Sequence, residues 1–316
     1  MRIATFNLEN WGEGPELAQR IRILQPQLLR LNADILFLQE VDGHRKTAHA
    51  PRDVSALRRL IEGTPYSEFH LSVTRSKHKA SGVLDVHNLV TLSRFPFKEG
   101  HQVLHDYVAP PAILLKDEAP IEAAWDRPFL YGCIEHDGRP LHLINVHLRA
   151  PLASYIPGGK SGPFTWNSVA HWAEGYFISS IKRSGQAFEV RRLCSELLAR
   201  DPEARIAIAG DFNAELNEMP LRLLIAAEED LGTGAFAHEC LVPLSRSLPL
   251  SNRFTVVHAG RPQMLDHILV SRTLFGAFKA IEAHNEMLTD EAVAFGRINQ
   301  PRGSLHAPVV AEFVKG

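Results

Sequence analysis

Cysteine is scarce in this chain: the 316 residues include three, far apart in the sequence, at Cys133, Cys194 and Cys240. There is no CxxC pair, which indicates a reducing compartment and argues against a thiolate metal site. Long apolar runs are missing too, since no segment approaches the roughly 18 residues that a membrane span requires. The first residues, MRIATFNLENW, are too polar for a signal peptide. We therefore expect a cytoplasmic protein without a membrane span.

A basic excess is the second absence. Lys and Arg together number 34 against 36 Asp and Glu, which gives a formal net charge of -2. Proteins that bind long duplex nucleic acid usually carry a basic excess, so this balance weakens the case for such a substrate. A net charge near zero for the whole chain is still compatible with a basic groove on one part of the surface.

Several catalytic signatures are absent as well. The chain has no HExxH motif, no nucleophile elbow and no glycine-rich dinucleotide fingerprint. The GGKS stretch at 158–161 resembles the end of a phosphate-binding loop, but the glycine that the spacing requires is Ser154, and Pro163 obstructs the helix that should follow. We therefore reject an ATP site.

Short apolar runs and amphipathic stretches are mixed along the chain. Strands are expected at 2–8, 35–40, 88–93, 129–135, 141–148, 205–211, 253–258, 265–271 and 308–314. Helices are expected at 186–200, at 218–229 and at 17–31, where Pro26 should kink or split the helix. The pattern predicts an α/β fold with two mixed sheets packed face to face and helices outside. We expect a single domain over 1–316 with a long inserted loop region at about 149–185 that is partly helical after Thr165.

Polar residues stand where several of these strands end. Asn7 follows the first run, and Glu40 closes a very apolar one, where burial of a carboxylate calls for a partner or a metal. In the run 141–148 side chains alternate between faces, so Asn145 and His147 share one face with two leucines. Asn7 also fits a simple turn, and His147 also fits a solvated strand edge.

The stretch RIAIAGDFNAE carries the strongest single signal. Asp211 and Asn213 follow a buried run, and their spacing allows both to point into one cleft, although an Asx turn would also explain the aspartate. Asp266 interrupts another apolar strand and needs a donor or a positive partner. Its neighbour His267 points to the opposite face, which leaves His306 as the best candidate.

Carboxylates, amides and histidines together favour metal-assisted chemistry on phosphate. Oxygen ligands with one Glu and amides suit Mg²⁺ or Mn²⁺, which share a phosphate with the protein. A carboxylate beside the centre suits activation of a water, and histidine and asparagine suit a phosphoryl group that gains charge during attack. The set favours hydrolysis of a phosphate ester, and its members are Asn7, Glu40, Asn145, His147, Asp211, Asn213, Asp266 and His306.

Seven motifs occur in one order: TFNLEN, LQEVD, SRFP, NVHL, GDFNAE, LDHILVS and SLHAPV. Together they resemble the endonuclease/exonuclease/phosphatase superfamily, the DNase I-like hydrolases, over nearly the whole chain. The resemblance implies a four-layered α/β sandwich with the active site where the two sheets meet. It implies a divalent metal near Asn7 and Glu40.

The resemblance also implies roles for the remaining residues. Asp211 would orient or activate the attacking water, Asn213 and His147 would hold the phosphate with Asn145 beside them, and Asp266 would pair with a catalytic His306. One position departs from the family pattern, because Leu305 stands where an Asp usually precedes the terminal histidine. The loss of this metal-side carboxylate should weaken Mg²⁺ binding or make metal binding depend more on the phosphate of the substrate.

The substrate stays open at this point. A nuclease or phosphodiesterase acting on DNA, RNA or a smaller phosphodiester leads. A phosphomonoesterase, a lipid or inositol-phosphate hydrolase and a binding protein with a weakened site remain alternatives. No obligate protein partner is evident. The region 149–185 has aromatic residues that either stack bases or pack the loop onto the body; these are Tyr155, Phe164, Trp166, Trp172, Tyr176 and Phe177.

Overall fold

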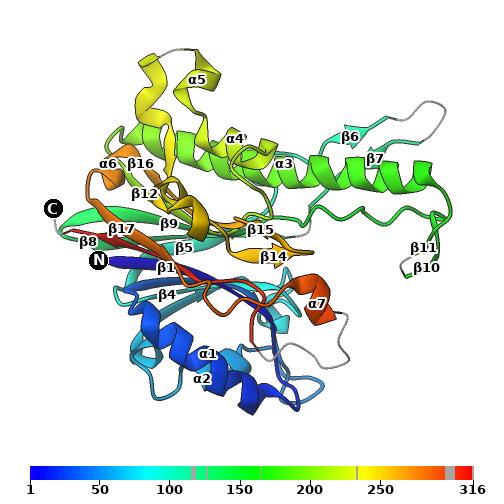
Figure 1. Ribbon diagram of the computed structural model, residues 1–316, viewed down its shortest axis with the longest axis horizontal. Coiled ribbons are helices and arrows are strands. Elements are labelled where there is room, and N and C mark those ends of the chain that lie inside the picture. Colours follow the sequence, from blue (N-terminus) through cyan, green and yellow to red (C-terminus); the bar gives the residue numbers. More distant parts are fainter. Residues whose placement is uncertain (115–118, 126, 164, 233, 296–302, 315–316) are drawn as a thin grey trace.

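Two six-stranded mixed sheets pack face to face and are covered on their outer faces by helices (Figure 1). The computed structural model describes residues 1–114, 119–125, 127–163, 165–232, 234–295 and 303–314. Its layers run helix, sheet, sheet, helix, which confirms the predicted four-layered α/β sandwich.

The first sheet is built around the N-terminal strand β1 (Arg2–Trp11). β1 pairs in parallel with β2 (Ile35–Val41) and antiparallel with β18 (Val309–Phe313). The sheet is completed by β17 (Phe278–Ala283) beyond β18, and by β4 (Asn88–Ser93) and β3 (His70–Val73) beyond β2. Its outer face packs against α1 (Leu17–Leu31) and α2 (Ser55–Ile61) through a core that includes Leu24, Leu28 and Leu57.

The second sheet has β12 (Arg205–Asp211) at its centre. β12 is parallel to β9 (Arg139–His147) and antiparallel to β16 (Asp266–Ser271). β8 (Phe129–His136) and β5 (Phe97–Val103) continue one side, and β13 (Leu241–Pro243) ends the other. Its outer face packs against α3 (Val169–Arg200) and α4 (Met219–Ile225), while Leu141, Leu143 and Ala207 face the first sheet.

Small elements fill the connections. Two-stranded hairpins are formed by β6 (Ala112–Ile113) with β7 (Ile121–Glu122), by β10 (Lys160–Gly162) with β11 (Thr165–Trp166), and by β14 (Val256–His258) with β15 (Arg261–Gln263). The short helices are α5 (Glu228–Leu231), α6 (Arg272–Phe275), α7 (Glu291–Phe295) and the 3₁₀ turns Pro65–Glu68, Lys79–Ser81, Gly234–Glu239, Leu244–Ser247 and Leu250–Asn252.

Three helix predictions need correction. α1 runs unbroken through Pro26, because Leu24, Leu28 and Leu31 anchor it on the core on both sides of the proline. The predicted helix at 218–229 ends at Ile225, where Ala226 adopts a left-handed conformation, and α5 follows separately. The helix predicted at 186–200 is the second half of α3, whose 32 residues begin at Val169, within the region expected to be partly helical after Thr165.

The strand predictions erred mostly at the edges of the sheets. β3, β5, β13 and β17 were not predicted, because edge strands are short or carry exposed polar residues and lack a continuous apolar run. The strand expected at 253–258 covers only Val256–His258. Within the described residues, no helix combines the length and apolar character needed to cross a membrane.

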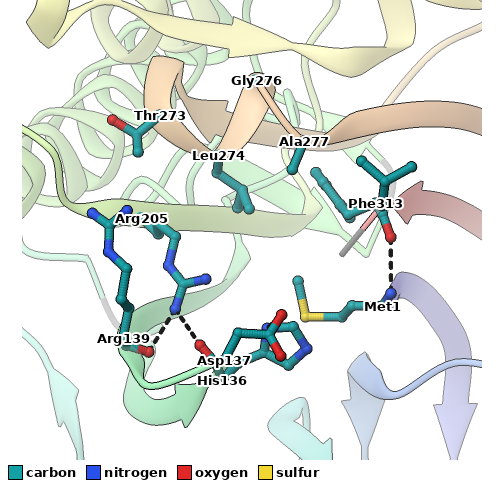
Figure 2. Close-up of a pocket in the computed structure, with 11 residues that line it drawn as sticks. Met1, His136, Asp137, Arg139, Arg205, Thr273, Leu274, Gly276, Ala277 and Phe313 are labelled. Carbon is teal, nitrogen blue, oxygen red and sulfur yellow. Dashed lines mark hydrogen bonds and ion pairs between the residues drawn. The ribbon is translucent and has the colours of Figure 1, made fainter. Parts of the chain in front are cut away.

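A pocket of about 480 Å³ lies near the amino-terminal ends of β1 and β12. Figure 2 shows Arg205 reaching across it to the backbone of the hairpin that joins β8 to β9. The Arg205 guanidinium donates to the carbonyl oxygens of His136, Arg139 and Pro140. Arg205 therefore clamps a turn of the scaffold at this end of the sheets.

Candidate active site

The carboxyl ends of the parallel strands bring most of the predicted residues together. In the second sheet Asp211 lies beside His147 on one neighbouring strand and beside Asp266 on the other. Gly210 makes this approach possible, because its φ is 149° and a Cβ there would lie 1.9 Å from the Val146 carbonyl oxygen. Asn7 comes from the facing sheet and donates to Asp211 Oδ2 at 3.0 Å.

Asp211 Oδ2 is the atom on which the site converges. The Asn213 amide donates to it at 3.3 Å, and the Nε2 atoms of His147 and His306 lie 3.5 and 3.9 Å away. Asp211 Oδ1 accepts the backbone N–H of Asn213 at 2.8 Å. Asp211 is 1% exposed, and this burial, opposed by the charge of His306, raises the pKa of its carboxyl to about 7.

Asp266 and His306 form the predicted pair, with His306 Nδ1 2.8 Å from Asp266 Oδ2. Burial disfavours the charged imidazole, but the carboxylates of Asp266 and Asp211 outweigh it and raise the pKa of His306 to about 10. His306 is therefore positively charged at neutral pH. As expected, His267 points away, with its Nε2 3.0 Å from the Ala214 carbonyl oxygen.

Glu40 and Asn7 approach this pair from β2 and β1 of the first sheet. Asn7 Nδ2 donates to Glu40 Oε1 at 3.2 Å, and the backbone N–H of Asn10 donates to Glu40 Oε2 at 2.9 Å. Glu40 has a φ of 59°, a left-handed conformation that costs a non-glycine residue about 1–2 kcal/mol. Such strain commonly accompanies functional sites.

Glu9 is a site residue that the sequence analysis missed. Its carboxylate Oε2 accepts the backbone N–H of Leu305 at 2.7 Å, so it reaches the position where the family pattern has an aspartate. Burial raises the pKa of Glu9, and the nearby carboxylate of Glu40 adds to this effect. Leu305 itself is 2% exposed and packs into the protein. The spacing of Asn7 and Glu9 in TFNLEN was the available signal.

A hard divalent cation fits this donor set. Glu9, Glu40, Asp211 and Asp266 place four carboxyl groups in one region, and Asp266 Oδ1 is buried with no hydrogen-bond partner among the residues that the structure describes. Potential ligand atoms also lie within 4.8 Å of one another in two groups, Glu40 with His87 and His147, and Asp211 with Asp266 and His306. Because His306 is protonated and His147 Nε2 accepts from Arg127, the carboxylates are the donors that fit a cation. Oxygen-rich sets of this kind suit Mg²⁺ or Mn²⁺.

Arg127 is a second residue that the sequence analysis missed. Its Nη1 lies 2.8 Å from His147 Nε2. Arginine cannot accept a hydrogen bond, so His147 Nε2 must be the acceptor and the ring must be neutral. Burial, followed by the charge of Arg127, lowers the pKa of His147 well below its usual range, which agrees with this state. No motif in the sequence marked Arg127, which lies 20 residues before its partner.

The two asparagines have different surroundings. Asn213 is partly exposed and has a φ of 48°, which turns the chain back over Asp211. Asn145 is fully buried, and its amide donates to the carbonyl oxygens of Leu38 and Val90 in the facing sheet while accepting from Gln39. Asn145 therefore lies beneath the site and ties the two sheets together, whereas Asn213 borders the open side.

This fold, with carboxylates and histidines at the ends of paired strands, defines a class of phosphoric ester hydrolases. The family model described as Endonuclease/Exonuclease/phosphatase family matches residues 4–281. The chain belongs to this family, whose members hydrolyse phosphoric esters with divalent metals. The terminal motif with His306 lies beyond the matched range.

Solved structures agree with the fold. A humanized TDP2 from D. rerio has a TM-score of 0.58 at 14% identity, with 100% of this chain and 99% of that chain covered. A truncated TDP2 from Caenorhabditis elegans has a TM-score of 0.57 at 14% identity, covering 99% and 98%. The 3'-5' exonuclease NExo from Neisseria meningitidis has a TM-score of 0.55 at 18% identity, covering 99% of both. No curated protein matches the sequence.

Proposed function

We propose that this protein is a Mg²⁺- or Mn²⁺-dependent phosphodiesterase that acts as a nuclease. The convergence of Asn7, Asn213, His147 and His306 on one oxygen of Asp211 carries the proposal. Two of the similar structures are complexes with DNA, a D. rerio TDP2 with a single-strand DNA product and the Neisseria 3' phosphatase NExo with a product DNA hairpin. These complexes support a nucleic-acid substrate for this chain.

In this proposal Asp211 positions the attacking water and takes its proton. A pKa of about 7 leaves a large fraction of the carboxyl able to accept a proton at neutral pH. The new bond joins the water oxygen to phosphorus, and the bond from phosphorus to the leaving oxygen breaks. Asp211 returns the proton to solvent, and the leaving oxygen takes one from solvent. The products are a phosphomonoester and an alcohol.

The other side chains hold the phosphoryl group. His306, kept charged by Asp266, supplies positive charge against its oxygens as their negative charge grows. Asn213 orients the phosphate, and neutral His147, predicted for the same role, holds the Arg127 guanidinium at the site by accepting from its Nη1. Asn145 supports them from below. Glu40, Asn7 and Glu9 would hold the divalent cation, which polarises the phosphate and offsets its charge.

A substrate screen tests this function. Bis-p-nitrophenyl phosphate, p-nitrophenyl phosphate, single- and double-stranded DNA, RNA and phospholipid are each incubated with Mg²⁺, with Mn²⁺ or with EDTA. We expect hydrolysis of the phosphodiesters that EDTA abolishes. Hydrolysis that persists in EDTA would refute the metal role, preference for p-nitrophenyl phosphate would favour a phosphomonoesterase, and cleavage of none would favour a binding protein.

A further inference from the structure

The region 149–185 contains an exposed aromatic pair that the proposed catalytic steps do not use. Trp172 and Tyr176 lie one turn apart on α3, with their rings stacked at a centroid distance of 5.4 Å and an interplanar angle of 27°. They are 45% and 38% exposed. Figure 1 shows the N-terminal half of α3 projecting beyond the sheets; we call this half, with the β10–β11 hairpin, the α3 arm.

The aromatic pair continues the face of α3 that borders the active site. Helical spacing places Trp172 and Tyr176 in line with Ser179, Arg183 and Gln186. Arg183 donates to the Asn213 carbonyl oxygen, and Gln186 Nε2 donates to the carbonyl oxygen of Arg127 at 3.1 Å. At about 1.5 Å per residue, Tyr176 and Trp172 lie roughly 10 and 16 Å along the helix from Arg183. The pair is thus within a few nucleotides of the site.

The α3 arm is braced, so its exposed rings are held in place. The Ser168 hydroxyl caps the helix by accepting the His171 N–H at 3.1 Å. The Ser154 N–H donates to the Gly175 carbonyl oxygen at 2.8 Å, and a Cβ on Gly175 would lie 2.4 Å from the Ser154 carbonyl oxygen. On such a support the exposed ring faces of the pair are available for stacking against flat apolar groups such as nucleic-acid bases.

Charge in this region is complementary to a polyanion. Residues 149–185 carry four basic residues and one acidic residue, hence a local net charge of +3, or +2 when the Glu218 carboxylate that pairs with Arg183 is counted, whereas the whole chain carries -2. Lys160 also lies over the Trp166 ring, 4.5 Å from its centroid. The basic residues are Arg149, Lys160, Lys182 and Arg183, and the acidic one is Glu174. Phe164 lies outside the described residues.

We propose that Trp172 and Tyr176 on the α3 arm stack the bases of a single-stranded nucleic acid whose backbone enters the active site. Stacking on side-chain rings requires bases that are free of a base-paired stack, and the chain lacks the general basic excess that favours long duplexes. This inference rests on the proposed function and specifies its substrate class. Of the other aromatic residues in region 149–185, Tyr155 is exposed, whereas Phe177 lies on the face of α3 opposite to Trp172 and Tyr176.

Binding of a fluorescent twelve-nucleotide oligothymidylate tests the inference, with the Trp172→Ala/Tyr176→Ala double variant compared with the wild type. We expect weakening of at least about tenfold, since each stacked base contributes roughly 5- to 150-fold in affinity. Phe188→Ala is the matched control: Phe188 is 43% exposed on the opposite face of the same helix. It should bind as the wild type does, and Trp172→Phe/Tyr176→Phe should restore binding.

Hydrolysis of bis-p-nitrophenyl phosphate separates this inference from the proposed function, because that substrate has no bases. It should be unchanged in the double variant. Absence of this hydrolysis in the wild type would count against the proposed function, while the binding comparison would still decide the role of the arm. Equal oligothymidylate binding by the wild type and the double variant overturns the inference. A double variant that binds oligothymidylate as the wild type does but no longer binds vesicles of phosphatidylserine and phosphatidylcholine also overturns it. That result would assign the arm to a lipid surface.

Discussion

Polar residues have different surroundings at the two ends of the sheets. At the carboxyl ends of β9 and β12, His147 and Asp211 are buried beside Asn7 of β1, and the carboxylates of Asp211 and Asp266 share the positive charge of His306. At the amino-terminal ends, Arg205 satisfies its guanidinium on backbone carbonyls (Figure 2). The carboxyl and imidazole groups of Asp211 and His306, whose pKa values are raised to about 7 and about 10, mark the first end as reactive, and the hydrogen bonds of Arg205 to the hairpin mark the second as scaffold.

Loss of the charged imidazole should have the largest effect at the reactive end. We expect His306→Ala to reduce kcat/KM for bis-p-nitrophenyl phosphate about 10²- to 10⁴-fold, because the ring supplies positive charge as the phosphoryl group gains charge. Steady-state kinetics at saturating Mg²⁺ measures this. Turnover within a few fold of the wild type would remove His306 from the mechanism.

The pH profile of activity should show the titration of Asp211 and His306. Activity should rise as Asp211 loses its proton near pH 7 and fall as His306 loses its proton towards pH 10. A bound cation would move the rising limb to lower pH. In Asp266→Asn the carboxylate that raises the pKa of His306 is gone, so the falling limb should move towards neutral pH. An unshifted alkaline limb in this variant would show that Asp266 does not set the charge of His306.

We expect the Glu9 carboxylate to supply the negative charge near the cation that an aspartate at position 305 would supply. Glu9→Gln keeps the acceptor for the Leu305 N–H but removes the negative charge, so we expect about tenfold weaker apparent Mg²⁺ affinity with little change in turnover at saturating metal. Leu305→Asp in that background should recover part of the loss. A Mg²⁺ titration of activity that Glu9→Gln leaves unchanged would place Glu9 away from the cation.

The scaffold end should respond in stability alone. Arg205→Ala removes three hydrogen bonds from a charged donor to the β8–β9 hairpin, and we expect it to cost about 1–2 kcal/mol of unfolding free energy. Thermal unfolding should show a Tm lower by a few degrees, with kcat/KM unchanged. A fall in kcat/KM without a fall in Tm would break the distinction between the two ends.

The sequence allowed the paired ends of the strands to be recognised because each apolar run stops at a polar residue. Asp211 and Asp266 fall at the ends of runs that are buried on both faces, so their burial and their need for partners were predictable. The edge strand β5, with the sequence FKEGHQV, has no such run, and its pairing with β8 supplies what its own residues do not.

Contacts between distant segments set the limits of sequence reasoning. Alternation along β9 placed Asn145 on the correct face but could not show that the opposite sheet covers it. Arg127 lies in the loop before β8 and Glu9 in the irregular last part of β1, and each is tied to the site by a contact with a distant segment. Pro26 failed to divide α1 because burial of the leucines around it outweighs the lost hydrogen bond.

The comparison of Asp211→Asn with Asp137→Asn tests the central claim most directly. Both remove one carboxylate charge with little change of shape; Asp211 lies in the strand-end site, and Asp137 lines the pocket at the other end of the sheets. The account predicts that Asp211→Asn lowers Mg²⁺-dependent hydrolysis of bis-p-nitrophenyl phosphate by at least about 10²-fold, whereas Asp137→Asn leaves it unchanged. Equal rates for the two variants would contradict it.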